Sequence, residues 1–190
     1  FAEEPTDSIT VLNTKSSVSI NGKTYSAYKI FNASNTDGKI EYSYDENDQS
    51  LLKVSYTPAG GSQLSGDDLI VWLSKQQNNP DVVRDFADHV YKTFIQNNTV
   101  TASGFGVASN ERAVIDLTSA GAGYYLVYGE ADPKDGVNDD EVVVAAVALT
   151  TANPTGKVNP KLNAPELEKT ILHNESDTWG VVGDNQIGDT

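Results

Sequence analysis

The chain has 190 residues, enough for one domain of ordinary size and a fragment of another, or for two small domains. It contains no cysteine, which excludes disulfides, cysteine-ligated zinc and thiol chemistry. Acidic residues outnumber basic ones by 27 to 13, and the net charge of −14 argues against nucleic acid or an anionic membrane surface as a partner. No apolar run approaches the roughly 20 residues that span a bilayer, so we expect no membrane contact from this segment.

The first sixty residues have the pattern of β-strands. Residues 8–13 alternate and are β-branched, Asn21-Gly22 signals a turn, and residues 25–31 are strand-like again, which together predict an opening hairpin. Residues 39–44 and 51–56 predict two further strands by the same pattern.

The hydrophobic period changes at Ser65, which predicts two helices between about 65 and 97. Ser65 can cap the first helix, and Pro80 suits the first turn of the second. An apolar stripe at helical spacing then runs along the second helix, and we interpret it as core packing: Val83, Phe86, Val90 and Phe94.

Strand patterns resume at residues 111–117, 124–128 and 141–150. Because strands and helices do not alternate regularly, we expect a mainly β fold, an antiparallel β-sandwich with a two-helix insertion. The composition changes at residues 152–156. We therefore divide the chain into a first domain (1–155), a linker (156–166) and the first strands of a truncated second domain (167–190).

The linker sets one lysine, Lys161, between two prolines, Pro160 and Pro165. Proline lacks a backbone N–H and favours an extended residue before it, so the strip is expected to be stiff, non-helical and exposed. The same spacing fits an ordinary interdomain linker with an ordinary surface lysine. Phe1-Ala2, at a start without methionine, matches the small-residue end of a cleaved signal peptide and predicts export.

Several segments, taken in order, resemble the major subunits of sortase-assembled Gram-positive pili. Residues 25–31 are similar to the "YxAYxIF" strand of their first domains, and residues 123–127 to their "GYYLV" strand. The ending at residues 184–190 resembles the "IGDTV" opening of the isopeptide-forming domain that follows in that family. The resemblance implies an Ig-like (Cna-B-type) sandwich in a structural, non-enzymatic subunit of an extracellular pilus on the cell wall of a Gram-positive bacterium.

The resemblance assigns the sortase acceptor to Lys161. A sortase holds the preceding subunit as a thioester, and the lysine amine attacks that acyl group to give an amide between subunits. The surrounding motif departs from the family's "YPKN" core, because Asn159 replaces tyrosine, Leu162 takes the asparagine position and Asn163 follows one place later. Lys157 is the rival acceptor. The implied partners are neighbouring pilin subunits, a pilus-specific sortase and host surface ligands.

A second amide, within one subunit, is also implied. Lys169 matches the first-strand lysine of the family's second domain, and its asparagine is expected beyond Thr190, so that Lys169 is unpaired in this chain. In the first domain, Lys29 with Glu111 or Asp116 and Asn153 is a conceivable set for the same chemistry, which burial of the amine and the acid promotes.

Other patterns give weaker indications. His89 and His173 are the only histidines and have no metal-spaced companions, so we expect no metal, no cofactor and no serine hydrolase. The acidic loop at 132–141 has oxygen ligands for calcium but fails the EF-hand pattern at Lys134. The main functional alternative is a surface or pilus-tip adhesin domain that binds a host protein or glycan.

Overall fold

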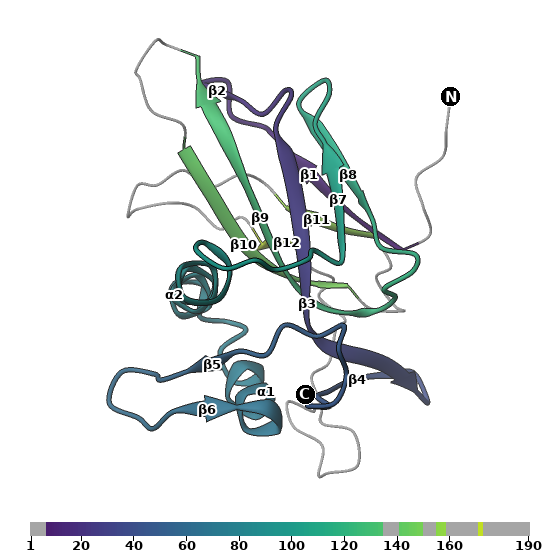
Figure 1. Cartoon of the computed structure of the whole chain (residues 1–190), viewed down its shortest axis with the longest axis vertical. Coiled ribbons are helices and arrows are strands. Elements are labelled where there is room, and N and C mark those ends of the chain that lie inside the picture. Colours follow the sequence, from purple (N-terminus) through teal and green to yellow (C-terminus); the bar gives the residue numbers. More distant parts are fainter. Residues whose placement is uncertain (1–6, 135–140, 150–154, 159–170, 173–190) are drawn as a thin grey trace.

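The structure, a computed structural model, describes residues 7–134, 141–149, 155–158 and 171–172. Most of its strands belong to two sheets that pack face to face, and the helices lie against the outer face of the larger sheet (Figure 1). Two short strands, β5 (Ser55–Tyr56) and β6 (Leu64–Ser65), form a separate small sheet beside the helices.

The smaller sheet has the strand order β12-β11-β1-β8. Its members are β1 (Ser8–Leu12), β8 (Arg112–Asp116), β11 (Thr155–Val158) and β12 (Ile171–Leu172). β1 is antiparallel to β8 but parallel to β11, while β11 and β12 are antiparallel. The first and the later parts of the chain are therefore joined in this sheet.

The larger sheet is antiparallel and has the order β10-β9-β3-β4. Its members are β3 (Thr24–Thr36), β4 (Lys39–Ser43), β9 (Gly123–Pro133) and β10 (Glu141–Leu149). β7 (Gly104–Val107) pairs with the first part of β3, and β2 (Val18–Ser19) pairs with the end of β9. The pairing of β3 with β9 shifts register between Lys29 and Phe31.

One hydrophobic core lies between the two sheets. The strands alternate, so every second side chain points inward, and the inward residues are mostly fully buried. This core consists of Ile9, Val11, Val18, Ile20, Tyr25, Ala27, Ala108, Ala113, Ile115, Leu117, Tyr125, Val127 and Ala131.

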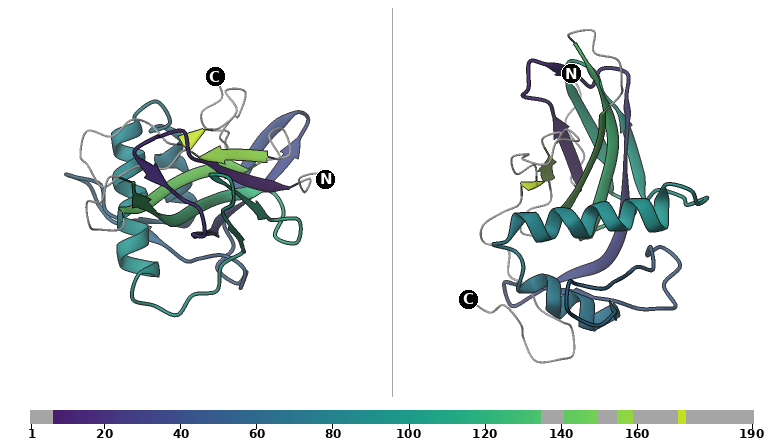
Figure 2. Two further views of the ribbon diagram at one scale, coloured as in Figure 1. Left: turned by 90° about the horizontal axis from the view of Figure 1, so that it is seen from above. Right: turned by 90° about the vertical axis from the view of Figure 1, so that its left-hand side faces the viewer.

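A second core lies between the larger sheet and the helices α1 (Gly66–Ser74), α2 (Pro80–Val90) and its π-helical continuation η1 (Tyr91–Ile95). Figure 2 shows α2 running across the strands on this face. The ring of Tyr91 stacks on that of Tyr128 in β9, with ring centroids 4.3 Å apart. The apolar stripe predicted on α2 contributes Val83, Phe86 and Val90 to this core.

The fold matches the predicted class in its main features: it is mainly β, its sheets are largely antiparallel, and two helices lie within 65–97. The prediction of an opening hairpin is wrong. β1 belongs to the smaller sheet and β3 to the larger one, so the Asn21-Gly22 turn joins β3 to the two-residue β2. The predicted strand at 51–56 is also wrong except at its last two residues, because the backbone N–H groups of Leu51 and Leu52 bond outside any strand ladder.

Candidate functional site

β11 ends two residues before Pro160, the first proline of the linker. In that strand Thr155 is opposite Ser8, and Val158 is opposite Val11, so the strip begins beside the end of β1. The predicted pilin-motif residues and the predicted intramolecular lysine lie outside the described residues: Asn159, Pro160, Lys161, Leu162, Asn163 and Lys169. The structure does describe β11, which immediately precedes these residues and pairs with β1.

The rival acceptor, Lys157, lies inside β11. Its backbone is opposite Thr10 of β1 on one side and Leu172 of β12 on the other. A residue flanked on both sides by paired strands has its backbone fixed by the sheet. An acceptor lysine must enter the cleft of an acylated enzyme, and the pairing of β11 on both sides restricts how far the backbone at 157 can move to do so.

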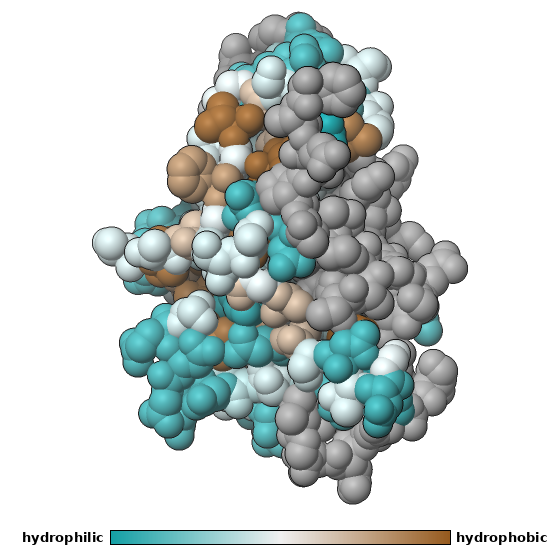
Figure 3. Space-filling model, turned by 90° about the vertical axis from the view of Figure 1, so that its right-hand side faces the viewer, coloured by the Kyte–Doolittle hydropathy of each residue, from teal (hydrophilic) through white to brown (hydrophobic). Residues whose placement is uncertain are grey.

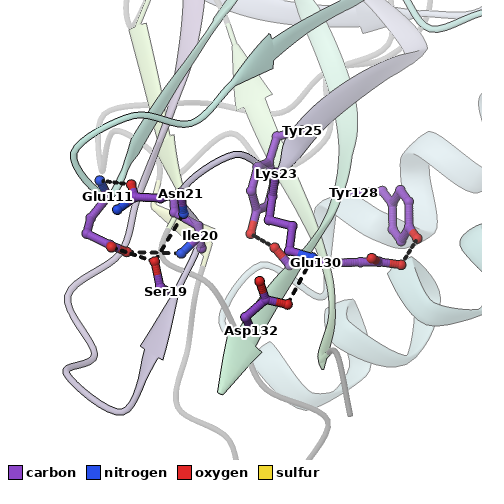
Figure 4. Close-up of polar contacts among 9 residues, drawn as sticks. All are labelled: Ser19, Ile20, Asn21, Lys23, Tyr25, Glu111, Tyr128, Glu130 and Asp132. Atoms are coloured by element: carbon purple, nitrogen blue, oxygen red, sulfur yellow. Dashed lines mark hydrogen bonds and ion pairs between the residues drawn. The ribbon is translucent and has the colours of Figure 1, made fainter. Parts of the chain in front are cut away.

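A carboxylate ties together the loops at the end of the sandwich where β1 finishes (Figure 4). Glu111 accepts hydrogen bonds from Asn13 Nδ2 (2.8 Å), Ser19 Oγ (2.7 Å) and the backbone N–H of Ile20 (3.0 Å). The backbone N–H of Glu111 in turn donates to Asn21 Oδ1. These bonds, the one from Asn13 above all, lower the pKa of Glu111 below its ordinary value.

The loop that carries Glu111 has an unusual backbone. Asn110 and Glu111 both have positive φ, +55° and +60°, a conformation that costs energy in residues with side chains. The bonds made by the Glu111 side chain and backbone offset this cost, because they exist only when the turn takes this shape. These hydrogen bonds therefore hold the loop between β7 and β8 against the segment 13–21 that connects β1 to β3.

The end of β9 carries further polar contacts at the same end (Figure 4). Tyr25 donates its hydroxyl to the backbone carbonyl of Glu130 (2.5 Å), and Tyr128 donates to the Glu130 carboxylate (3.1 Å). Lys23 forms an ion pair with Asp132 (2.9 Å). The charged side chains on this part of the sheet are thus engaged with partners in the same chain.

The first-domain isopeptide set does not assemble in the described residues. Lys29 is buried between the sheets, where its amine donates to the carbonyl of Ala120 (2.5 Å). Burial lowers the pKa of this lysine, as that chemistry requires. Sequence reasoning did not identify the burial, although strand alternation from Tyr25 and Ala27 places residue 29 on the same inward face.

Neither predicted acid accompanies Lys29. Glu111 is hydrogen-bonded to Ser19, which lies opposite Asp132 of β9. Lys29 lies opposite Tyr125 of the same strand. The seven residues of β9 between Tyr125 and Asp132 put Glu111 roughly 23 Å from Lys29. Asp116 is exposed, and its hydrogen bonds from Thr118 lower its pKa. A proton-donating acid needs the opposite shift. Asn153 lies outside the described residues.

The remaining candidate sites carry little chemistry. His89 bonds the carbonyl of Ser55 through Nε2 and packs edge-on against Tyr56. Within the described ranges no group of histidine and carboxylate side chains could hold a metal. His173 and most of the 132–141 loop lie outside those ranges. No helix among the described residues has the length and apolar character of a membrane span.

One hollow of about 270 Å³ lies beside β3, between the segments 49–53 and 99–103. Its wall includes Lys53, whose ammonium is bound by the carbonyls of Asp48 and Leu51, and Ser103, whose hydroxyl accepts from the backbone of Lys29. The described residues that line the hollow bring together no nucleophile and base.

No protein-family model matches the chain, and no curated protein is significantly similar to it.

Proposed function

We propose that this chain is the N-terminal part of a structural subunit of a covalently polymerised pilus on the surface of a Gram-positive bacterium, with an Ig-like (Cna-B-type) sandwich as its first domain. The observation that carries the proposal is the pairing of the two strands that bear the family's motifs. Ala27 and Tyr28 of the "YxAYxIF" segment are opposite Val127 and Leu126 of the "GYYLV" segment. Segments almost a hundred residues apart thus form the centre of one sheet.

The positions of the helices and of β11 also support the proposal. α1 and α2 fall between the two motif strands in the chain, where the family's first domains carry their helices. β11 is the last strand before the proline-bearing strip, so the strip follows directly from a fixed sheet. A displayed lysine needs such an anchor, because an acyl-enzyme cleft must be able to approach it without unfolding the domain.

In the proposed reaction, the amine of Lys161 attacks the thioester that joins the preceding subunit to the sortase cysteine. The C–N bond of an amide forms, the C–S bond breaks, and the enzyme's thiol is regenerated with the proton that the amine loses. Lysine suits this role because its long, flexible stem presents a compact amine that is nucleophilic once deprotonated. The chain itself supplies only the acceptor, so we propose that it is not an enzyme.

Site-directed variants test the proposal. Co-expression of the full-length protein with its pilus-specific sortase should give ladders of high-molecular-weight species on denaturing gels. Lys161→Arg should abolish them, because arginine keeps the positive charge but provides no amine nucleophile at ordinary pH, whereas Lys157→Arg should leave them intact. Persistence of ladders in Lys161→Arg, or their loss only in Lys157→Arg, would show that the acceptor has been assigned to the wrong residue.

The second candidate is an adhesin domain, and the hollow beside β3 is the feature that favours it. The lining of the hollow is more polar than apolar, and such groups could hydrogen-bond to the hydroxyls of a glycan. An adhesin would bind host protein or glycan as a monomer and would need no acceptor lysine. Binding that is lost in a Lys53→Gln or Ser103→Ala variant, together with the absence of ladders, would favour this second function.

A further inference from the structure

The edge of β3 has a gap between its two neighbouring strands, and the hollow lies at this gap. β7 pairs with β3 as far as Ala27, and β4 pairs with it from Asn32 onward, so residues 28–31 have neither strand as a neighbour. Two loop segments, 49–53 and 99–103, close the gap and form the walls of the hollow. Figure 3 shows the side of the molecule on which β4 and β7 lie in Figure 1, and pale, weakly polar residues occupy much of its middle.

Both walls of the hollow are fixed to the backbone of one residue, Lys29. Its N–H donates to Ser103 Oγ (3.0 Å) on one wall, and its carbonyl accepts from the N–H of Leu52 (2.7 Å) on the other. The N–H of Ser103 also donates to the carbonyl of Ala27 (2.7 Å). These bonds take the place of the ladder that a neighbouring strand would provide. Because the walls are held in this way, a ligand does not have to order them when it binds.

The charge of the hollow is opposite to that of the chain. The described residues that line it include two lysines and no acid, whereas the chain has a net charge of −14. The first lysine, Lys29, is buried, and its amine donates to the carbonyl of Ala120. The second, Lys53, is only half-buried, so it supplies the accessible cation of the hollow.

The ammonium of Lys53 is held in place by neutral groups. It donates to the backbone carbonyls of Asp48 and Leu51, and it forms no ion pair within the described part of the chain. The carboxylate of Asp48 accepts instead from Asn32 Nδ2 (2.9 Å) and from the hydroxyl of Ser50 (2.6 Å). An ammonium has three donors, so one is taken by neither carbonyl. A hydrogen bond from such a donor to a carboxylate is roughly twice as strong as one between neutral groups.

The rest of the lining suits the hydroxyl groups of a sugar. It includes four hydroxyl side chains and one amide: Ser50, Thr99, Thr101, Ser103 and Gln49. Hydroxyl and amide groups both donate and accept hydrogen bonds, as sugar hydroxyls do. The volume of about 270 Å³ lies just below the range of pockets for drug-sized ligands, roughly 300–1,000 Å³, which is consistent with a single sugar ring.

We propose that the hollow beside β3 binds a hexuronic acid residue, a sugar ring that carries a carboxylate. The carboxylate lies against Lys53, and the ring hydroxyls lie against the serine and threonine side chains of the two walls. A neutral sugar would leave the third donor of the ammonium without an anionic partner, and a simple anion would leave the hydroxyl side chains unused. The inference does not depend on polymerisation, because it uses neither Lys161 nor a sortase.

Matched pairs of sugars test the proposal. The methyl glycosides of glucuronic, galacturonic and mannuronic acid differ from those of their parent hexoses only by a carboxylate in place of a hydroxymethyl group. Each is titrated into the 190-residue protein, and the backbone amide signals are followed by NMR. We expect at least one uronide to shift the signals of 49–53 and 99–103 and to bind roughly tenfold more tightly than its parent hexose and than acetate. Equal affinities within every pair, acetate binding as tight as that of the uronides, or no shift in these segments would overturn the proposal.

A charge variant provides the second measurement. Lys53→Gln should weaken uronide binding by roughly tenfold and leave the binding of the parent hexose unchanged. The control, Lys75→Gln, removes the same charge at an exposed position outside the lining and should bind as the wild type does. Unchanged uronide binding in Lys53→Gln would overturn the proposal. If that variant does not fold, added salt replaces it, because salt should weaken the binding of the uronide but not that of the hexose.

The outcomes of these titrations are separate from those of the polymerisation test. Ladders without any uronide binding would overturn the sugar site and leave the proposed function standing. Uronide binding without ladders would support the site and favour the adhesin function over the pilus subunit.

Discussion

The ring of Tyr25 fills the space that a side chain at Gly129 would need. A Cβ atom at position 129 would lie less than 3.0 Å from three atoms of that ring, closer than real Cβ atoms approach any neighbour. Tyr25 is itself fully buried and bonded through its hydroxyl to the carbonyl of Glu130. The glycine in β9 and the tyrosine in β3 are therefore two halves of one packing unit between the sheets.

This relationship predicts that Gly129→Ala destabilises the domain by about 2–3 kcal/mol, as expected when a methyl group is forced into a packed core. In a Tyr25→Leu background the same substitution should cost at least about 1 kcal/mol less, because the ring is gone. Urea unfolding of the four proteins measures both values. Gly61→Ala is the control, since a Cβ there makes only ordinary contacts of 3.6 Å or more. Equal costs in the two backgrounds would mean that ring and glycine are not coupled.

The Glu111 bonds predict a specific dependence of stability on pH. The folded state lowers the pKa of this carboxyl below its ordinary 4.5, so its stabilising effect is full above that pH and is lost as pH falls through the folded value. The difference in unfolding free energy between wild type and Glu111→Gln should therefore shrink between about pH 6 and about pH 3. Asn13→Ala removes the bond with the largest effect on the pKa and should weaken the same trend. A difference that stays constant over this range contradicts the assignment.

Lys29 predicts a trend at alkaline pH. Burial lowers the pKa of its amine below the ordinary 10.5, so the folded state disfavours the charged form. Between the folded pKa and 10.5 the unfolded chain binds more protons, and the stability of the wild type should rise with pH relative to Lys29→Met. Lys75→Met, which changes the same atoms at an exposed position, is the control. If the difference in unfolding free energy between the wild type and Lys29→Met does not change with pH, the Lys29 amine is not desolvated.

Intact mass tests the assignments of intramolecular amides. Lys169 should be unpaired in this 190-residue chain, and the first-domain set around Lys29 lacks its acid, so the measured mass should equal the sequence mass. Each Lys–Asn amide would release one ammonia, about 17 Da. A loss of one ammonia that maps to Lys169 would contradict its assignment to a second domain. A loss that maps to Lys29 would show that an acid other than Glu111 or Asp116 promotes amide formation at Lys29.

The sequence was sufficient for elements whose signals are local. The change of hydrophobic period at Ser65 located both helices, and alternation located β4, β8, β9 and β10, because period follows from which face of an element is buried. The Asn21-Gly22 turn was also found, and Gly22 has the positive φ of +83° that such a turn needs. A turn signal, however, does not identify the partner of the strand that precedes it.

The pairings that the sequence could not supply are those between distant segments. β1 pairs with residues a hundred or more positions away in β8 and β11, and the Glu111 bonds span 91 to 98 positions. No local pattern encodes such distances. The close approach of β7 to β8 requires glycine at positions 104 and 106, because a Cβ there would clash with the carbonyls of Asp116 and Val114. The sequence shows the two glycines but not the strand that approaches them.

Mass spectrometry of the polymer's cross-linked peptides tests whether Lys161, three residues after β11, joins one subunit to the next. Protease digestion of the ladders should release a branched peptide in which the C-terminal residue left by sortase cleavage is bonded to Nζ of Lys161. Lys157 and the lysines of the described sheets and helices should be recovered unmodified. A branch at any of these other lysines, or polymers with no branched peptide from residues 157–169, would contradict the account.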